Sequence, residues 1–198
     1  MVLIHGQKSC WNLSRGKADK LIILGDILYH GPRNDLPDGY NCKRVIALLN
    51  PLKKDIIAVR GNCDSEVDQM VLDFPMRSDY ALYDVDGHHF FLTHGHLYNE
   101  DQLPLLNDND ILVYGHFHKP IAKKKDNIYI INPSSISLPK EGTNSYAIYE
   151  NHRIVIKDFN QNIVKNHFRI KGWLVEIIII FFCYNQKIRA NYIKVWYF

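Results

Sequence analysis

The sequence predicts an α/β fold built around strands that end in polar loops. Three observations predict it: short apolar runs recur between residues 20 and 150, a helical stripe separates the first two, and four runs end at glycine beside Asp, Asn or His. The 198 residues are 46% hydrophobic and 23% charged, which suits one domain with a sizeable core. That balance excludes a disordered chain, a collagen-like repeat and a small disulfide-stapled protein.

Each predicted element follows from a local pattern. The first apolar run, Lys20–Leu24, is short enough for a buried strand and stops at Gly25. Asn41–Leu49 places apolar residues at helical spacing and ends before Pro51, so a helix is expected there. Three more buried strands are predicted at Asp55–Val59, His89–Thr93 and Asp110–Tyr114. Further strands are expected at Asn127–Ile131, Ser145–Tyr149 and, as an edge hairpin partner, His152–Ile156.

The four loops that follow the buried strands carry metal-ligand side chains. Ligands of open α/β sheets bind outside the carboxyl ends of strands, so four such loops at one sheet edge indicate a site. The oxygens and imidazoles suit manganese, iron, zinc, cobalt or nickel, and they belong to Asp26, Asn62, His94, His116 and His118. Alone, a Gly-Asp pair is usually a turn and a His-x-His an ordinary loop. The occurrence of all four in order is what predicts a metal site.

The spacing of these residues suits two neighbouring ions. His116 and His118 leave one loop at different angles, and the carboxylate of Asp26 can bridge. Two metals about 3.5–4 Å apart stabilise the attacking and leaving oxygens of an in-line displacement, as in phosphatases and nucleases. A water acidified by both ions would then be the nucleophile, so no Ser or Cys nucleophile is needed.

The motifs together resemble the calcineurin-like metallophosphoesterase superfamily. The series is GD at 25–26, GNCD at 61–64, THGH at 93–96 and GHFH at 115–118. The stretches at 30–40, 61–70 and 131–140 are similar to its bacterial YfcE-type phosphodiesterase branch. The resemblance covers roughly residues 20–158. It implies a four-layer α/β-β/α sandwich, two divalent metal ions, with manganese expected, and hydrolysis of phosphodiester bonds.

The resemblance also implies roles for single residues. Asp26 would bridge the ions, with Asn62, His94 and His116 completing one site. His118 and His5 would serve the other site, and Asp64 would orient a ligand.

Cys63 stands where most of the superfamily has the histidine that is proposed to protonate the leaving group or contact the phosphoryl oxygen. A thiol is a poor general acid unless its pKa is tuned, which favours substrates with good leaving groups. The catalytic prediction is therefore Asn62, Cys63, Asp64 and His94. Substrate binding is predicted for Cys63 and for His96, whose alternative is an ordinary solvent-facing loop residue.

Both ends of the sequence depart from the family pattern. Leu3 occupies a position where the family has a ligand Asp, and only four residues precede His5, which predicts a truncated N-terminal strand. The hypothesis is that the ion held by His5 binds weakly and that activity is low or absent.

Residues 159–198 contain six Lys or Arg, the single acid Glu176 and ten aromatics, so they carry +5 against −2 for residues 1–158. The predicted domains are therefore 1–158, the metallophosphoesterase domain, and 159–198, an atypical aromatic and Ile-rich basic extension. The extension resembles translated AT-rich DNA; the alternative is an amphipathic or membrane-touching segment. Its apolar run, Trp173–Cys183, is too short to span a membrane.

The leading function is a metal-dependent phosphodiesterase acting on a small phosphodiester. The alternative is a catalytically inactive protein-binding module on the same fold. Nucleic acid is not expected as a partner because residues 1–158 are slightly acidic and lack a basic stripe. Four widely spaced cysteines without a CxxC pair, and no signal peptide, predict a cytoplasmic protein. Homo-oligomerisation is left open.

Overall fold

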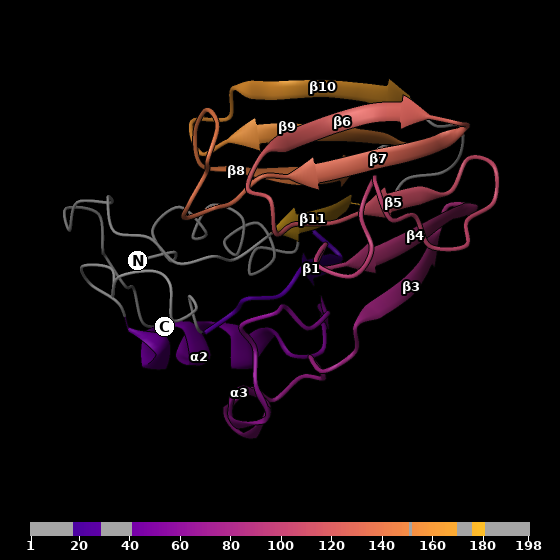
Figure 1. Cartoon of the computed structure of the whole chain (residues 1–198). Helices are drawn as coiled ribbons and strands as arrows, with labels where there is room; N and C mark the ends of the chain where they lie inside the picture. Colours follow the sequence, from indigo (N-terminus) through magenta and orange to yellow (C-terminus); the bar gives the residue numbers. More distant parts are fainter. Residues whose placement is uncertain (1–17, 29–40, 151, 170–175, 181–198) are drawn as a thin grey trace.

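Two β-sheets stacked face to face form the body of the protein (Figure 1). The structure is a computed structural model that describes residues 18–28, 41–150, 152–169 and 176–180, the side chains of 166–169 and 176–178 excepted. The predictions for Leu3, His5, the 30–40 stretch and residues 181–198 lie outside the described residues.

The first sheet has six strands in the order β10-β9-β8-β11-β1-β2. Strand β1 runs parallel to β2 on one side and to β11 on the other, whereas β8, β9 and β10 continue the sheet as antiparallel neighbours. The strands are β1 (Lys20–Ile23), β2 (Ile56–Ala58), β8 (Ser145–Glu150), β9 (Arg153–Asp158), β10 (Ile163–Arg169) and β11 (Glu176–Ile180).

The second sheet has five strands in the order β3-β4-β5-β7-β6. Its centre is parallel, since β5 pairs in parallel with β4 and β7, and an antiparallel strand closes each edge. The strands are β3 (Tyr80–Val85), β4 (His88–Thr93), β5 (Ile111–Val113), β6 (Pro120–Lys125) and β7 (Ile128–Pro133).

Short helices follow β1 and β2. Helix α2 (Cys42–Leu49) begins at Asn41, whose side-chain oxygen accepts the Arg44 N–H at 3.0 Å, and it runs into the 3-10 turn η1 (Asn50–Leu52). Helix α3 (Glu66–Val71) follows β2, and the Ser65 N–H donates to Asp68 at 2.7 Å at its start. No helix within the described ranges is long and apolar enough to cross a membrane.

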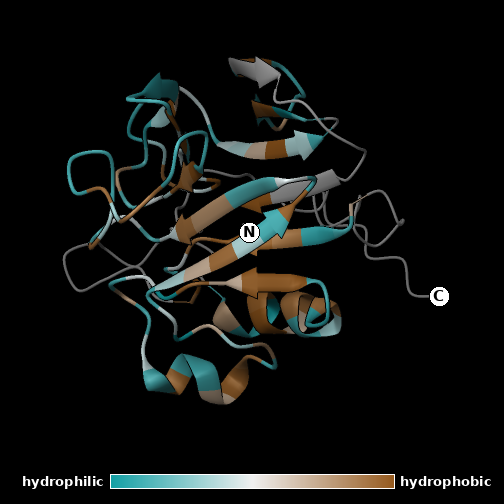
Figure 2. Ribbon diagram, turned by 90° about the vertical axis from the view of Figure 1, so that its right-hand side faces the viewer, coloured by the Kyte–Doolittle hydropathy of each residue, from teal (hydrophilic) through white to brown (hydrophobic). Residues whose placement is uncertain are grey.

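The buried apolar residues form three clusters. Figure 2 shows hydrophobic stretches along the strands at the centre of the molecule. Between the sheets lie side chains of both, such as Ile22 from the first and Phe90 from the second. The outer face of the first sheet packs on helix α2 through Val45 and Leu49. The third cluster contains Leu112 of the second sheet, and the described residues packed against it are Tyr98 and Leu106 from loops and Ile121 of the edge strand β6.

The predicted elements of residues 20–158 are confirmed in kind and in order. The main difference concerns the predicted edge strand at His152–Ile156, because the corresponding strand β9 lies between β8 and β10. Strands β10 and β11 come from the segment predicted as an extension. The boundary at residue 158 stays a prediction, but both strands beyond it pair within the first sheet.

Candidate metal centre

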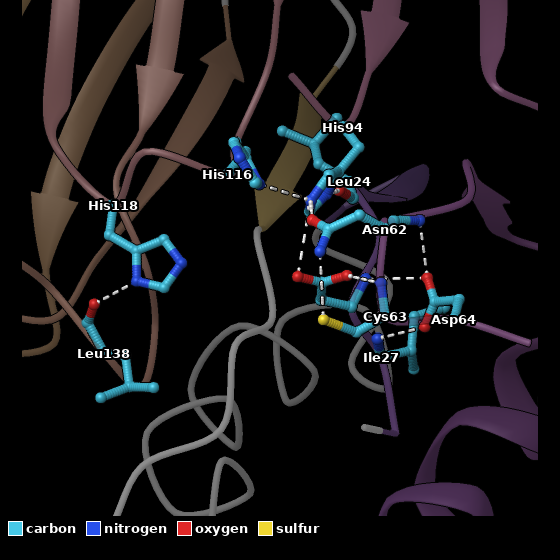
Figure 3. A network of polar contacts seen from close by, with 12 residues as sticks. Leu24, Ile27, Asn62, Cys63, Asp64, His94, His116, His118 and Leu138 are labelled. Atoms are coloured by element: carbon cyan, nitrogen blue, oxygen red, sulfur yellow. Dashed lines mark hydrogen bonds and ion pairs between the residues drawn. The ribbon is translucent and has the colours of Figure 1, made fainter. Parts of the chain in front are cut away.

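Four strand-end loops bring their polar side chains together around His94 (Figure 3). His94 follows β4, and its Nε2 lies 2.9 Å from Asn62 Oδ1, which comes from the loop after β2. The same nitrogen lies 3.1 Å from His116 Nδ1, after β5, and 3.4 Å from Asp26 Oδ2, after β1. Ligand atoms about 2.1 Å from one ion and at right angles to each other are about 3 Å apart, so these spacings suit a shared ion.

The hydrogen bonding of His94 defines which nitrogen faces the cluster. Its Nδ1–H donates to the Leu24 carbonyl at 2.7 Å, which leaves the lone pair on Nε2. Burial lowers the pKa of His94 to about 3, so the ring is neutral near pH 7. An unprotonated nitrogen, an amide oxygen and a carboxylate oxygen therefore face one another, which is the donor set that a divalent cation satisfies.

Asp26 is buried and closely confined. Burial raises its pKa to about 7, while the Cys63 N–H donates to Oδ1 at 2.9 Å and partly offsets that rise. The glycine in the next loop makes room for it, because a Cβ on Gly61 would overlap the Oδ1 and N atoms of Asp26. Gly25 and Gly61 thus allow the two loops to approach closely enough for Asp26 to enter the cluster.

Asp64 holds the same two loops together without facing the cluster. Its carboxylate accepts the backbone N–H groups of Asp26 and Ile27 at 2.8 Å and of Gly61 at 2.7 Å. Burial raises the pKa of Asp64, and these hydrogen bonds act in the opposite direction. The Asp64 carboxylate therefore fixes the backbone that carries Asp26 and Asn62.

His118 lies apart from the His94 cluster (Figure 3). Its Nδ1–H donates to the Leu138 carbonyl at 2.6 Å, so Nε2 carries the lone pair. Burial lowers the pKa of His118 to about 4. Its predicted companion, His5, is outside the described residues. Within the described ranges, no group of three or more His, Cys, Asp or Glu side chains is arranged so that it could hold a metal ion by itself. The cluster at His94 includes the amide oxygen of Asn62 as well.

The two predicted substrate residues lie beside the cluster. Asn62 Nδ2 donates to Cys63 Sγ at 3.3 Å, and the thiol is partly exposed. The His96 ring lies 5.2 Å from that of His94, and burial lowers its pKa. The nearby ion pair of Arg60 and Asp79, with an N···O distance of 2.9 Å, also acts electrostatically on His96.

Sequence reasoning missed the side chains that support the GHFH loop. Both His116 and His118 have a left-handed backbone, with φ of 58° and 59°. Asn132 Nδ2 donates to the Gly115 carbonyl at 2.7 Å, and Ser134 Oγ donates to the His118 carbonyl at 3.0 Å. Both supporting side chains are buried at the end of β7. In the sequence, polar residues directly follow the apolar strand in Ile131–Ser135 (INPSS), and this pattern could have indicated a role near the site.

Fold and site together define a metal-dependent phosphoesterase scaffold. Residues 5–153 match the calcineurin-like phosphoesterase superfamily domain, and the chain belongs to this superfamily.

Named relatives agree with this assignment. The chain is 50% identical over 135 residues to the phosphodiesterase YfcE of Escherichia coli K12, covering 68% of this chain and 73% of that protein. It is 31% identical over 123 residues to a probable metallophosphoesterase, YsnB, of Bacillus subtilis, covering 57% and 68%. The solved structure of the E. coli phosphoesterase YfcE superposes with a TM-score of 0.80 at 42% identity, covering 84% of this chain and 92% of that chain.

Proposed function

We propose that this chain is a metal-dependent phosphodiesterase acting on small phosphodiesters. The observation that carries the proposal is the convergence of acceptor atoms on the unprotonated Nε2 of His94. Membership of the phosphoesterase superfamily and the similarity to a named phosphodiesterase support it.

The residues that would hold the first ion are Asp26, Asn62, His94 and His116, and His118 with His5 would hold the second. Two divalent ions, with manganese proposed, would acidify the attacking water and stabilise the charge on the phosphoryl and leaving oxygens. The chain's own contribution is orientation. The Leu24 carbonyl keeps the lone pair of His94 directed at the cluster, and Asp64 holds the loops of Asp26 and Asn62 in register.

We propose that Cys63 and His96 face the substrate. The Cys63 backbone N–H is engaged by Asp26, so the loop is fixed while the thiol stays partly exposed. A thiol donates protons poorly to a leaving oxygen, which favours diesters whose leaving group needs no protonation, such as aryl diesters.

The hypothesis of a weakened second site rests on Leu3, which lacks the carboxylate that the family pattern has there. The same residue favours the second candidate function, an inactive protein-binding module on this scaffold. The described ligand set opposes that alternative, because the unprotonated Nε2 of buried His94 lies 3.4 Å from an oxygen of buried Asp26, and a cation would satisfy both. A cytoplasmic location is proposed as well, and it is supported by the thiol of Cys42, which forms no disulfide.

The test is hydrolysis of bis(p-nitrophenyl) phosphate with and without manganese, in the chain as it stands and in Leu3→Asp. Manganese-dependent turnover in the chain as it stands supports the phosphodiesterase. Turnover in Leu3→Asp alone identifies an enzyme impaired at its second site. No turnover in either protein, with manganese bound, would favour the binding module.

A further inference from the structure

Strand β11 occupies the interior of the first sheet although it comes from the far end of the chain (Figure 1). It pairs in parallel with β1, with Ile23 opposite Ile180. On its other side it pairs antiparallel with β8, with Ile179 opposite Ala147. Both of its backbone edges are therefore engaged.

The last two residues of β11 pack on opposite faces of the sheet. Ile179 is 0% exposed and belongs to the core between the two sheets. Ile180 is 1% exposed and packs in the core shared with helix α2. A strand buried on both faces is fixed in position by its side chains as well as by its ladder.

From the end of β11 a short path of hydrogen bonds leads to the metal centre. The Leu24 N–H donates to the Ile180 carbonyl at 3.1 Å. The Leu24 carbonyl in turn accepts the Nδ1–H of His94 at 2.7 Å. Leu24 itself is 0% exposed, so neither of its backbone groups has solvent as a substitute partner.

We propose that Ile180 of β11 is a positioning residue for His94, acting through the peptide groups of Leu24. The inference rests on the proposed function only in taking His94 as a metal ligand. Strand β2 cannot replace β11 in this role, because the backbone bond from that side joins the Val59 N–H to the Ile23 carbonyl at 3.0 Å, one residue before Leu24. The segment predicted as an extension thus contributes directly to the geometry of the centre.

The experiment compares Ile180→Ala with Ile163→Ala in the full chain. Ile163 is the matched control because it is the same residue type on β10 of the same sheet, but 56% exposed. Three quantities are measured: amide hydrogen exchange at Leu24, the NMR signal of the His94 Nδ1–H proton, and manganese affinity by calorimetry. Ile180→Ala should speed exchange at Leu24 about tenfold, shift or broaden the imidazole proton signal and weaken manganese binding about tenfold. The control should change none of them by more than about twofold.

Unchanged exchange, imidazole signal and manganese affinity in a folded Ile180→Ala protein would overturn the proposal. If Ile180→Ala does not fold, Ile180→Val decides by the same three measurements with smaller expected shifts. If the unmodified chain binds no manganese, the proposed function fails; the two spectroscopic measurements need no metal and still decide the role of Ile180.

Discussion

Strand β4 carries a histidine cluster at each end, and the two clusters are built differently. At its carboxyl end, His94 meets Asn62, His116 and Asp26. At its amino end, His88 lies 5.7 Å, ring to ring, from His152. His88 and His152 at one end and His94 at the other are all buried, so burial of the histidines alone does not distinguish the clusters.

The two clusters differ in whether a hydrogen-bond donor faces the histidine side chains. At the amino end a donor is present, because the hydroxyl of Tyr149 donates to Asp86 at 3.0 Å and lies 3.3 Å from His152 Nδ1, whereas the buried His152 Nε2 has no hydrogen-bond partner among the described residues. At the carboxyl end, the backbone takes the only Nδ1 proton of His94, and acceptors face its other nitrogen. Converging acceptors, rather than buried histidines, therefore mark the candidate metal centre.

The largest expected effect comes from removing the histidine at the centre. His94→Ala should lower manganese affinity and phosphodiester turnover by at least about 100-fold, because loss of a ligand exceeds the 10–100-fold typical of outer partners. The matched control is His152→Ala, which removes a buried imidazole at the other end of β4 and should leave both unchanged. Calorimetry and a turnover assay make the comparison; equal losses in the two variants would remove the distinction between the clusters.

Asp64→Asn is expected to have the second largest effect and to lower manganese affinity by about 10–100-fold. An amide cannot accept the three backbone N–H bonds from Asp26, Ile27 and Gly61 as strongly as a carboxylate, so the ligand loops should loosen. Asp84→Asn, on the exposed side of β3, is the control and should bind manganese normally. Unaltered affinity in Asp64→Asn would show that these loops hold their geometry without the carboxylate.

The third expectation concerns pH. Burial raises the pKa of Asp26 to about 7, so below that pH a metal must displace its proton. Manganese affinity should therefore fall about tenfold per unit from pH 7 to pH 5, and calorimetry across that range measures it. His94 does not add to this slope, since its pKa is about 3. An affinity independent of pH would contradict the assignment of Asp26 as a ligand.

Without metal, the same two groups act on stability with opposite signs. Asp26 has a raised pKa in the folded state, so its contribution favours folding at low pH and is lost as pH rises toward 7. His94 has a depressed pKa, so its contribution is lost as pH falls from about 6.5 toward 3. Between about pH 4 and 6.5, the fall in stability with pH due to Asp26 and the rise due to His94 nearly cancel. Metal affinity is therefore the clearer measurement.

The smallest effect is expected at the other cluster. Tyr149→Phe removes the hydroxyl bound to Asp86 and should lower the free energy of unfolding by about 0.5–1.5 kcal/mol without changing turnover. Urea unfolding measures the first quantity and the phosphodiester assay the second. Tyr80→Phe, on a half-exposed side chain, controls for loss of a hydroxyl as such.

The sequence predicted the parts of this molecule that depend on local pattern. Apolar runs and the loops after them located β1, β2, β4 and β5, and therefore the strand ends that carry Asp26, Asn62, His94 and His116. The supporting contacts could not be found this way. The Leu24 carbonyl receives His94 from 70 residues away, and Asn132 reaches Gly115 across 17 residues, so both depend on how the sheets assemble.

The place of β11 shows the same limit more strongly. Glu176–Ile180 has the composition of a buried strand, but composition does not tell which strands it pairs with. Its pairing with β1 and β8 joins segments more than 150 residues and about 30 residues apart in the chain, and only the assembled sheet reveals it. The composition of residues 159–198 therefore does not tell how Glu176–Ile180 is placed in the sheet.

The most direct test of the metal centre is anomalous X-ray scattering from crystals of the chain grown with manganese. We expect a full-strength manganese peak within ligand distance of Asp26, Asn62, His94 and His116, and a weaker peak near His118. A peak at His88 and His152 instead, or no peak at the His94 cluster in a protein that hydrolyses phosphodiesters, would contradict it.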